Sequence, residues 1–375
     1  MKIAIVCYPT FGGSGVVATE LGIELSKKNH EIHFITYSQP VRLEALNEKL
    51  HFHEVNVPNY SLFKFKPYEL ALSSRLLDVV KSNDIDILHV HYAIPHAYAA
   101  YMAKKMLQDE GINIPIVTTL HGTDITLVGS HPFYKSAVSF SINHSDCITA
   151  VSESLKNDTI ELFDTKKQID VIHNFIDVDK VISKETPCER SLLASDDEKI
   201  VVHISNFRPL KRTMDVIYVF EQISAKIKSR LIMVGEGPDK SKAQKYCEKN
   251  NLDNIVLFLG NSSEIDEILC FSDIFLLPSE KESFGLSALE AMIHKVPVIS
   301  TNVGGLPELN INNYSGFLFD VGEINKMAKK SIEILSDEKL LNKYKRQAFK
   351  NAKRFDIKKI INEYELIYEK AIKMK

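Results

Sequence analysis

Short apolar runs alternate with helix-like segments along the chain, and this alternation restricts the fold more than any other feature. In the first half, the apolar runs cover residues 2–8, 31–38, 52–57, 87–92, 115–121, 147–152 and 169–173. Apolar residues at helical spacing lie between them, notably over 16–28, 67–81, 95–108 and 153–163. Strands that alternate with helices form parallel sheets. This half therefore predicts a doubly wound α/β domain.

A polar segment without periodicity begins at residue 177 and reaches about residue 199. A second alternating set follows it, with apolar runs over 200–205, 230–235, 255–260, 274–277, 297–301 and 316–319. A chain of 375 residues is also too long for one ordinary core. We expect two doubly wound α/β domains, over residues 1–176 and 177–356.

The composition is that of an ordinary globular protein, with 45% hydrophobic and 25% charged residues. A net charge of −3 gives no general attraction to nucleic acid, so no nucleic-acid partner is expected. Apolar runs are too short for a signal peptide or a membrane span, which predicts a cytoplasmic protein without stable membrane insertion. Five widely spaced cysteines indicate buried thiols rather than disulfides. The oligomeric state stays open, a homo-oligomer included.

One stretch, residues 277–292, joins a buried strand to a helix through a loop with two carboxylates. Ligands of open α/β sheets bind at the carboxyl ends of strands, and a helix start offers free N–H groups to anions. Glu282 in the loop and Glu290 in the helix can accept hydrogen bonds from hydroxyl pairs. The stretch favours a polyhydroxylated ligand that carries phosphate, such as a nucleotide sugar. Solvated surface glutamates are the alternative.

Two other loops carry groups suited to anions. A glycine-rich turn around Gly13 precedes the first helix, although its spacing fits neither the dinucleotide nor the ATP loop. A basic cluster with Arg208 and Lys211 follows the first strand of the second half. Such cations would neutralise a leaving diphosphate where no metal does so, and a solvated helix start is the alternative.

Three histidines, His89, His91 and His96, invite a metal hypothesis, but their spacing argues against it. His89 and His91 share one face of a strand, whereas His96 lies beyond a proline in the next element. No neighbouring cysteine or carboxylate completes a ligand set. We therefore expect no metal and no cofactor.

The string Glu282-Ser283-Phe284-Gly285-Leu286, followed by Glu290, resembles the Glu-x7-Glu motif of the retaining glycosyltransferases of family 4. That family has the GT-B fold, two facing Rossmann-like domains with a cleft between them. The resemblance implies that Glu282 meets the transferred hexose and that Glu290 meets the nucleotide ribose. It also implies that the final helix, over about 357–375, crosses back onto the first domain.

The same resemblance gives roles to residues at other strand ends. His121 is expected to contact the transferred sugar, and Lys211 and Arg208 the diphosphate. Asn206 stands where the family usually has the arginine, and Phe175 follows Asn174 in place of a glycine, so both strings depart from the pattern. Expected donor-binding residues are Gly13, Asn174, Ser205, Asn206, Leu259, Gly260, Ser283, Phe284, Gly285, Leu286 and Glu290.

Within the family, the strings at 89–97, 118–126, 203–208 and 279–286 look like those of members that begin bacillithiol biosynthesis. This implies UDP-N-acetylglucosamine as donor, L-malate as acceptor and same-face attack with retention. Hydroxyls of Ser14, Tyr92, Thr119 and Thr123 would hold the acceptor. The cation for malate stays open among Lys64, Lys66, Lys135 and Arg42.

Two alternatives remain at this point. Another family 4 transferase would act on a lipid or polysaccharide, for which residues 63–66, Phe-Lys-Phe-Lys, are the one hint. A non-catalytic sensor of nucleotide sugars would bind the donor without turnover.

Overall fold

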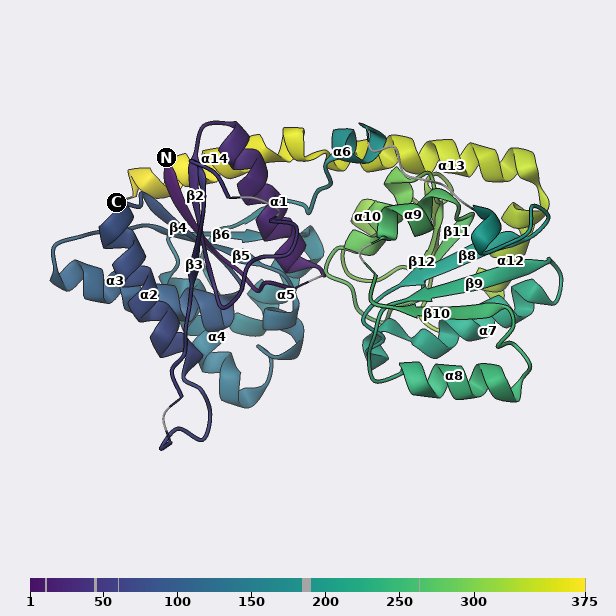
Figure 1. The fold of residues 1–375 in the computed structure, drawn as a ribbon, viewed down its shortest axis with the longest axis horizontal. Coiled ribbons are helices and arrows are strands. Elements are labelled where there is room, and N and C mark those ends of the chain that lie inside the picture. Colours follow the sequence, from purple (N-terminus) through teal and green to yellow (C-terminus); the bar gives the residue numbers. More distant parts are fainter. Residues whose placement is uncertain (11, 44–45, 60, 184–189, 263, 375) are drawn as a thin grey trace. The chain divides into compact units, whose positions relative to one another are not determined.

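The chain, in a computed structural model, divides into two compact units (Figure 1). Unit 1 comprises Met1–Phe175 and Ile357–Lys375, and unit 2 comprises Ile176–Asp356. The structure describes residues 1–10, 12–43, 46–59, 61–183, 190–262 and 264–374. Each unit contains one parallel sheet with helices, which confirms the predicted α/β class.

The sheet of unit 1 has seven parallel strands in the order β3-β2-β1-β4-β5-β6-β7. The chain moves outward from β1 to β3 and then returns to the other side of β1, so the strand order reverses between β1 and β4. Loops diverge at such a reversal and leave room for a ligand at the carboxyl ends of the two strands. The strands are β1 (Lys2–Val6), β2 (Glu31–Thr36), β3 (Leu50–Glu54), β4 (Ile87–His91), β5 (Ile116–Leu120), β6 (Cys147–Ala150) and β7 (Ile169–Val171).

The sheet of unit 2 has six parallel strands in the order β10-β9-β8-β11-β12-β13, and its order reverses between β8 and β11. The strands are β8 (Lys199–Ile204), β9 (Ser229–Val234), β10 (Val256–Gly260), β11 (Ile274–Leu277), β12 (Val298–Thr301) and β13 (Gly316–Phe319). In the described part of the chain, the ends of the thirteen strands lie within three residues of the ends of the apolar runs in the sequence. Fully buried strands read as continuous apolar runs, which explains this agreement.

The helices bury an apolar stripe against these sheets. Those of unit 1 are α1 (Ser14–Lys27), α2 (Tyr68–Asn83), α3 (Tyr98–Asp109), α4 (Pro132–His144), α5 (Glu153–Phe163) and α14 (Ile357–Lys373). Those of unit 2 are α6 (Val178–Ser183), α7 (Thr213–Ser224), α8 (Lys240–Lys249), α9 (Ile265–Cys270), α10 (Leu286–Ile293), α11 (Leu306–Leu309), α12 (Ile324–Ser336) and α13 (Glu338–Ala352).

Helix α14 packs in unit 1, against α1 and the strands β4, β5 and β6. Its buried residues recur at helical spacing, and the largest of them are Tyr364 and Tyr368. The Tyr368 hydroxyl lies 2.8 Å from Nδ1 of His89, in the middle of β4. This helix therefore completes the polar core of the sheet beneath the expected site.

Two expectations need correction. The helix expected over 95–108 starts at Tyr98, because Ala93–Ala97 forms a π-helical turn with a non-helical residue, Ile94, inside it. The expectation of free thiols holds for Cys7, Cys147 and Cys247, which are buried and unpaired, but Cys270 is disulfide-bonded. Cys188 lies outside the described residues.

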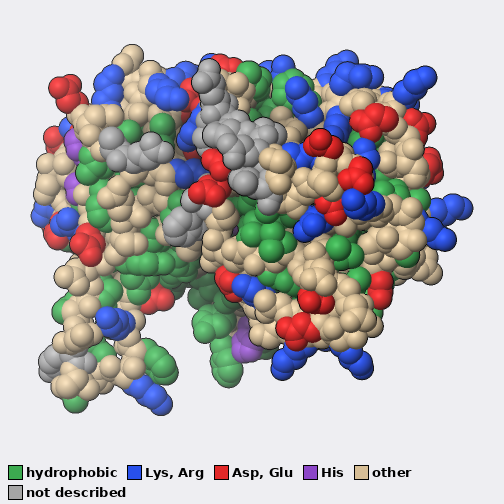
Figure 2. All heavy atoms as spheres, turned by 45° about the vertical axis from the view of Figure 1, so that its right-hand side comes forward, with side chains coloured by type: hydrophobic (Ala, Val, Ile, Leu, Met, Phe, Trp, Pro, Cys, Tyr) green, Lys and Arg blue, Asp and Glu red, His purple; other side chains and the backbone are tan. Residues whose placement is uncertain are grey.

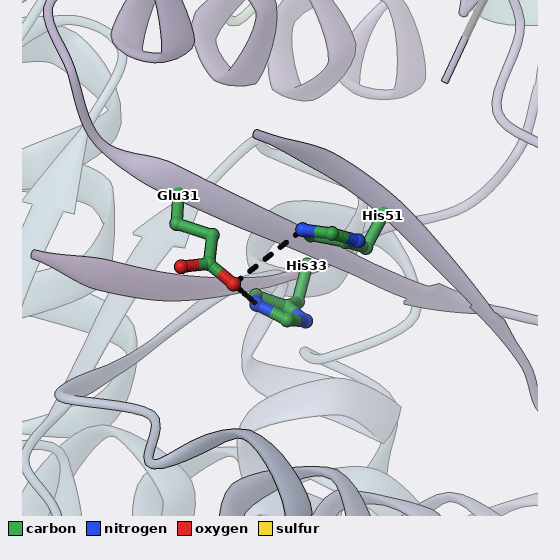
Figure 3. Close-up of side chains that lie close together, drawn as sticks. All are labelled: Glu31, His33 and His51. Carbon is green, nitrogen blue, oxygen red and sulfur yellow. Dashed lines mark hydrogen bonds and ion pairs between the residues drawn. The ribbon is translucent and has the colours of Figure 1, made fainter. Parts of the chain in front are cut away.

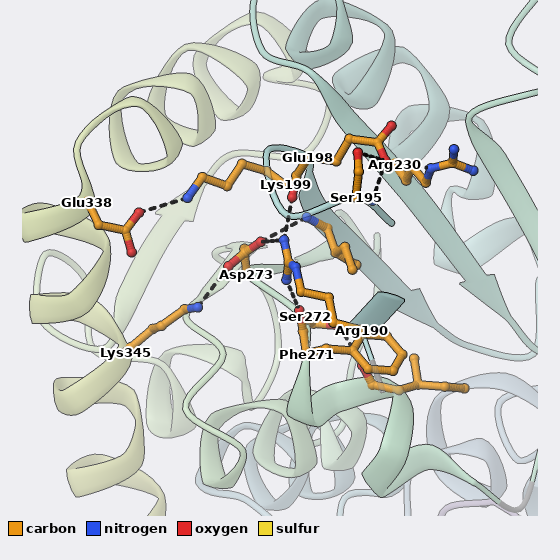
Figure 4. Close-up of polar contacts among 12 residues, drawn as sticks. Arg190, Ser195, Glu198, Lys199, Arg230, Phe271, Ser272, Asp273, Glu338 and Lys345 are labelled. Carbon is orange, nitrogen blue, oxygen red and sulfur yellow. Dashed lines mark hydrogen bonds and ion pairs between the residues drawn. The ribbon is translucent and has the colours of Figure 1, made fainter. Parts of the chain in front are cut away.

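A charged cluster ties the amino-terminal ends of β8 and β11 together in unit 2 (Figure 4). Asp273, 4% exposed, accepts hydrogen bonds from the backbone N–H of Ile200 at 2.9 Å and from Nη2 of Arg190 at 3.1 Å. Lys345 of α13 donates to its other oxygen at 2.8 Å. Burial alone would raise the pKa of Asp273, but these partners hold it below its ordinary value.

Lysine and arginine side chains are interspersed with aspartate and glutamate on the face drawn in Figure 2. Mixed signs agree with the small net charge of −3. Among the described residues, no helix is both long and apolar enough to cross a membrane.

Candidate functional site

A hydrogen bond bridges the reversal of strand order in unit 1, and it joins two residues that were predicted to bind the acceptor substrate. Ser14 starts α1 after β1, and its hydroxyl donates to the Tyr92 hydroxyl, beyond the end of β4, at 2.7 Å. Gly13 precedes Ser14 and is exposed. The Tyr8 ring, at the end of β1, packs edge-on against Tyr92 with 5.4 Å between ring centroids. Tyr8 was not among the predicted site residues, although its place two residues beyond β1 is a usable signal.

The next strand end in the sheet carries His121, the residue expected to contact the sugar. Its Nε2 lies 2.8 Å from Nδ1 of His91, on the neighbouring strand β4. Burial lowers the pKa of His121 to about 3, and burial likewise lowers that of His91, so both rings are uncharged at neutral pH. A neutral imidazole has one donor and one acceptor nitrogen, which suits hydroxyl groups better than phosphate.

Asp124 holds the His121 loop in place, and sequence reasoning overlooked it. The carboxylate is 3% exposed and accepts from the backbone N–H groups of Gly122 at 3.0 Å and His121 at 3.3 Å. Its other oxygen accepts from the N–H of Ala93 at 2.8 Å, in the loop after β4. Asp124 therefore joins the loops that follow β4 and β5.

Thr119 does not fit its predicted role in acceptor binding. The side chain is fully buried, and its hydroxyl lies 2.8 Å from Nε2 of His89 and 2.7 Å from the Thr149 hydroxyl. Thr119 therefore belongs to the polar core of the sheet, contrary to the expectation. Thr123, by contrast, is partly exposed at the start of the turn that follows Gly122.

An ion pair bridges the reversal of strand order in unit 2. Lys211 follows β8 and Glu282 follows β11, and Nζ of Lys211 lies 2.5 Å from Oε1 of Glu282. The Ser279 hydroxyl donates to the same oxygen at 2.9 Å. Both charged side chains are largely buried, with 18% and 9% of their surfaces exposed. Two residues that the sequence selected separately thus form one charged centre.

Backbone contacts fix these two loops relative to each other. The N–H of Glu280 donates to the carbonyl of Leu210 at 2.7 Å, next to Lys211. Gly304, in the loop after β12, has a φ of +55°, and a Cβ there would stand 1.8 Å from the carbonyl oxygen of Glu282. Only glycine fits this position. Gly304 is a positioning residue that was not predicted, although a glycine pair in the loop after a strand is a recognisable signal.

Helix α10 begins beside Glu282. Gly285 is its N-cap, with a φ of +97°, and Leu286 is its first residue. Ser283 is partly exposed, whereas Phe284 is 2% exposed and packs against Phe355 with ring centroids 5.4 Å apart. The side chain of Phe284 is thus structural. Glu290 lies partly exposed in the second turn of the helix.

The loop after β8 carries Ser205, Asn206 and Arg208, of which the last two are exposed. Nδ1 of His203 lies 2.8 Å from the carbonyl of Leu276 and must donate, so Nε2 accepts from the Ser205 hydroxyl at 2.8 Å. Ser205 therefore shapes the loop, and it also accepts from the N–H of Phe207.

The remaining donor residues lie at other strand ends. Leu259 is 38% exposed, and Gly260 accepts a hydrogen bond from the N–H of Gly235 at 2.7 Å. Asn174 follows β7 in unit 1 and is 7% exposed, and its buried Oδ1 has no hydrogen-bond partner among the residues that the structure describes. Buried amide oxygens usually accept a hydrogen bond, so Oδ1 of Asn174 is available to accept one from a ligand or a water molecule.

The four candidate cations for malate differ in their surroundings. Lys66 lines a pocket with Pro58, Asn59, Ser61 and Phe63, in the loop after β3. Arg42 donates to Glu20 at 3.4 Å, while Lys64 and Lys135 are exposed. These contacts do not single out one of the four.

Two family models match the chain, one on each half. Glycosyltransferase Family 4 matches residues 11–180, and Glycosyl transferases group 1 matches residues 186–351. N-acetyl-alpha-D-glucosaminyl L-malate synthase from Bacillus anthracis is 45% identical over 98% of this chain and 96% of that protein.

Solved structures of similar fold cover nearly the whole chain. A glycosyltransferase from Rickettsia africae is 21% identical, with a TM-score of 0.79 over 100% of this chain and 99% of that one. HepE from Anabaena, in complex with UDP and glucose, is 19% identical, with a TM-score of 0.80 over 98% and 99%. At this identity the likeness concerns the fold, and it confirms the expected GT-B class.

Proposed function

Because the chain belongs to the family 4 glycosyltransferases, we propose that it moves N-acetylglucosamine from UDP-N-acetylglucosamine to the hydroxyl of L-malate, with retention at the anomeric carbon. The Bacillus anthracis relative is an N-acetyl-alpha-D-glucosaminyl L-malate synthase, and this supports both the transferred sugar and the acceptor. A cytoplasmic location, where nucleotide sugars and small acids are made, is part of this proposal.

The ion pair between Lys211 and Glu282 is the observation that carries the proposal. A cation and a carboxylate stand together at the strand reversal of unit 2, beside the start of α10. A leaving diphosphate needs positive charge, and sugar hydroxyls need acceptors. Lys211 would serve the phosphate, with exposed Arg208 nearby in the chain, and Glu282 the hexose. Glu290 would take the ribose, and backbone groups at Leu259 and Gly260 the base.

Unit 1 supplies neutral groups, and we assign these to the sugar and the acceptor. His121, held by His91 and Asp124, would contact the hexose. Ser14 and Tyr92, already joined at 2.7 Å, would position the malate hydroxyl together with Thr123. N–H groups at the Gly13 turn would meet phosphate oxygens.

The proposed reaction needs no covalent intermediate. The malate hydroxyl attacks the anomeric carbon on the face that the diphosphate leaves, through an oxocarbenium-like transition state. The bond from the anomeric carbon to the phosphate oxygen breaks, and that oxygen takes the hydroxyl proton. Lys211 stabilises the charge that grows on the leaving group, which is why its effect should appear in turnover.

One assay tests the function. Purified protein is given UDP-N-acetylglucosamine with L-malate or with a panel of other hydroxy acids, and UDP release is measured. We expect rapid release with malate and an α-linked product by the proton coupling at the anomeric carbon. Donor binding without turnover on any acid would instead indicate a sensor. A β-linked product, or a sugar trapped on a carboxylate of the chain, would overturn the mechanism.

A lipid acceptor is the alternative, and the same UDP-release assay tests it when lipid acceptors replace the hydroxy acids. Phe63 and Phe65 are 52% and 80% exposed in the loop after β3, beside Lys64 and Lys66. Amphipathic segments of this kind bind anionic membranes in other proteins. Turnover with a lipid acceptor and none with malate would move the function to that class.

A further inference from the structure

We propose that unit 1 carries a binding site for a zinc-class transition metal ion, built from Glu31, His33 and His51 at the edge of the sheet (Figure 3). Their ligand atoms all lie within 4.8 Å of one another. The site is independent of the proposed transferase activity, because it lies at the amino-terminal ends of β2 and β3, whereas the loops of the candidate site follow the carboxyl ends of the strands.

Strand register brings the three residues together. Glu31 and His33 are two apart in β2, so their side chains share one face of the sheet. His51 of the parallel edge strand β3 stands directly opposite His33. Side chains opposite each other on neighbouring strands are within contact distance. The cluster thus arises from pairing between strands and cannot be seen in either strand alone.

The distances match the edges of a metal tetrahedron. Oε1 of Glu31 lies 3.1 Å from Nε2 of His33 and 3.4 Å from Nε2 of His51. Zinc bonds of about 2.0–2.1 Å place neighbouring tetrahedral ligands roughly 3.3 Å apart. Figure 3 shows the carboxylate oxygen directed at both rings. Two imidazoles and one carboxylate favour zinc over magnesium or calcium, which prefer oxygen ligands throughout.

His51 provides the second, independent observation. Its Nε2 is enclosed by the protein and makes no hydrogen bond among the described residues, although Oε1 of Glu31 lies 3.4 Å away as an ion-pair partner. Such an atom is costly unless something binds it. The His33 and His51 rings are now stacked, with centroids 4.5 Å apart. The His51 side chain is 36% exposed. Coordination would turn its ring so that Nε2 of His51 and Nε2 of His33 both point at the ion.

Groups around the cluster are arranged to orient the ligands. Nδ1 of His33, the nitrogen that would not coordinate, lies 2.8 Å from Nε2 of His53 in β3. Hydrogen bonds to the far nitrogen of a ligand histidine fix its ring. Lys2 approaches the other oxygen of Glu31 at 3.9 Å and leaves Oε1 to the two rings. Glu31 and His51 are each about one-third exposed, so water has access to a fourth position.

The bound ion would fasten the edge strand β3 to β2. An edge strand pairs on one side only, so fewer contacts hold it against local opening. Coordination by His33 and His51 adds a link between the two strands. We therefore assign the metal a structural role, to be read out as stability and not as turnover.

The test uses the full-length protein without a histidine tag, stripped with a chelator and dialysed against Zn²⁺. We expect one zinc per chain by elemental analysis, retained in excess Mg²⁺. Co²⁺ should give the intense visible bands of a tetrahedral site. His51→Gln and Glu31→Gln should each lose this metal. His144→Gln, the same change at an exposed histidine of α4, is the matched control and should keep it.

Thermal unfolding gives the second readout. Zinc should raise the melting temperature of the wild type and of His144→Gln, but not that of His51→Gln, because an ion that binds only the folded chain stabilises it. Circular dichroism of both glutamine variants checks that they are folded. Zinc bound equally by His51→Gln and by the wild type, or no zinc bound by the wild type, would overturn the proposal.

Discussion

Units 1 and 2 share a fold but place different chemistry at the reversal of strand order. In unit 1 the groups that bridge the reversal are neutral, because Ser14 bonds to Tyr92. Next to them, His121 meets His91 across β4 and β5, and burial lowers the pKa of both rings. In unit 2 the bridging groups are ions, Lys211 and Glu282. The parallel sheet fixes where a ligand site forms, while the side chains at the reversal decide whether that site suits hydroxyls or phosphate.

The buried interiors differ in the same way. Unit 1 pairs the uncharged His89 with Tyr368 and Thr119. Unit 2 instead buries the Asp273 carboxylate against Arg190 and Lys345. Neutral networks lose stability when they must take up protons, and ionic networks lose stability when a partner is removed. Acid should therefore destabilise unit 1 more than unit 2, and removal of a charged partner should destabilise unit 2.

The largest expected effect is on the ionic interior of unit 2. Asp273→Ala should lower the free energy of unfolding of unit 2 by roughly 3 kcal/mol. This is the lower end of the range for a broken buried pair, because about a quarter of the Arg190 and Lys345 side chains is exposed. Hydrogen exchange in β8 and β11 measures the loss, and unit 1 should keep its protection. Glu338→Ala, which removes the exposed pair with Lys199, is the control and should cost less than about 1 kcal/mol.

Next in size is the charged centre itself. Lys211→Ala should lower kcat about 10²–10³-fold, as expected for the loss of one group that stabilises charge in the transition state. Steady-state kinetics with both substrates varied gives the value. Lys281→Ala, at an exposed lysine beside Glu282, should leave kcat unchanged. A rise in the Michaelis constant alone would assign Lys211 to ground-state binding.

A smaller effect is expected at the ribose. Glu290→Ala should weaken donor binding by about 1.5–3 kcal/mol, because a charged acceptor of hydrogen bonds is lost. Calorimetric titration with UDP measures it. Glu333→Ala, the same change on helix α12 at the pair with Lys330, serves as control. Equal UDP affinity in wild type and Glu290→Ala would place the ribose elsewhere.

Acid should act first on unit 1. Burial lowers the pKa of His89 and His121 to about 3 and that of His96 to about 4, from 6.5. Between pH 6.5 and these lowered pKa values, the three histidines bind protons in the unfolded chain but not in the folded chain. The stability that these histidines contribute is therefore complete above pH 6.5 and falls as the pH drops, by up to about 1.4 kcal/mol per pH unit for each histidine. Asp124, whose pKa burial raises to about 6, offsets part of this loss, because its folded form takes up a proton first.

Hydrogen exchange at pH 7 and pH 5, corrected for intrinsic rates, compares the two units. Unit 2 has His203, with a pKa lowered to about 4, and should lose less protection. Its Asp273, with a lowered pKa, should lose stability only below its ordinary value of 3.8. Equal losses in both units at pH 5 would remove the contrast between neutral and ionic interiors.

The smallest expected effect is that of a chelator on turnover. Lys211 and Arg208 would neutralise the diphosphate, so EDTA should leave kcat unchanged while lowering only the melting temperature through the zinc site. Loss of turnover in EDTA that magnesium or manganese restores would mean that the charged centre of unit 2 is incomplete without a metal.

The sequence by itself determined the elements and the class of site. Apolar runs located every strand, and the pattern around Glu282 and Glu290 located the helix start, because burial and capping leave local marks in a sequence. These features depend on neighbours within a few residues, so they require no knowledge of the fold. The last helix, which begins at Ile357, was expected from the family resemblance instead.

Only the tertiary structure decided which residues meet. Lys211 and Glu282 are 71 residues apart, and the burial of Thr119 and the approach of Gly304 to Glu282 depend equally on how strands are ordered. His33 and His51 likewise face each other through the register of β2 and β3. Parallel pairing joins strands that are distant in the chain, and no local pattern records their order or register.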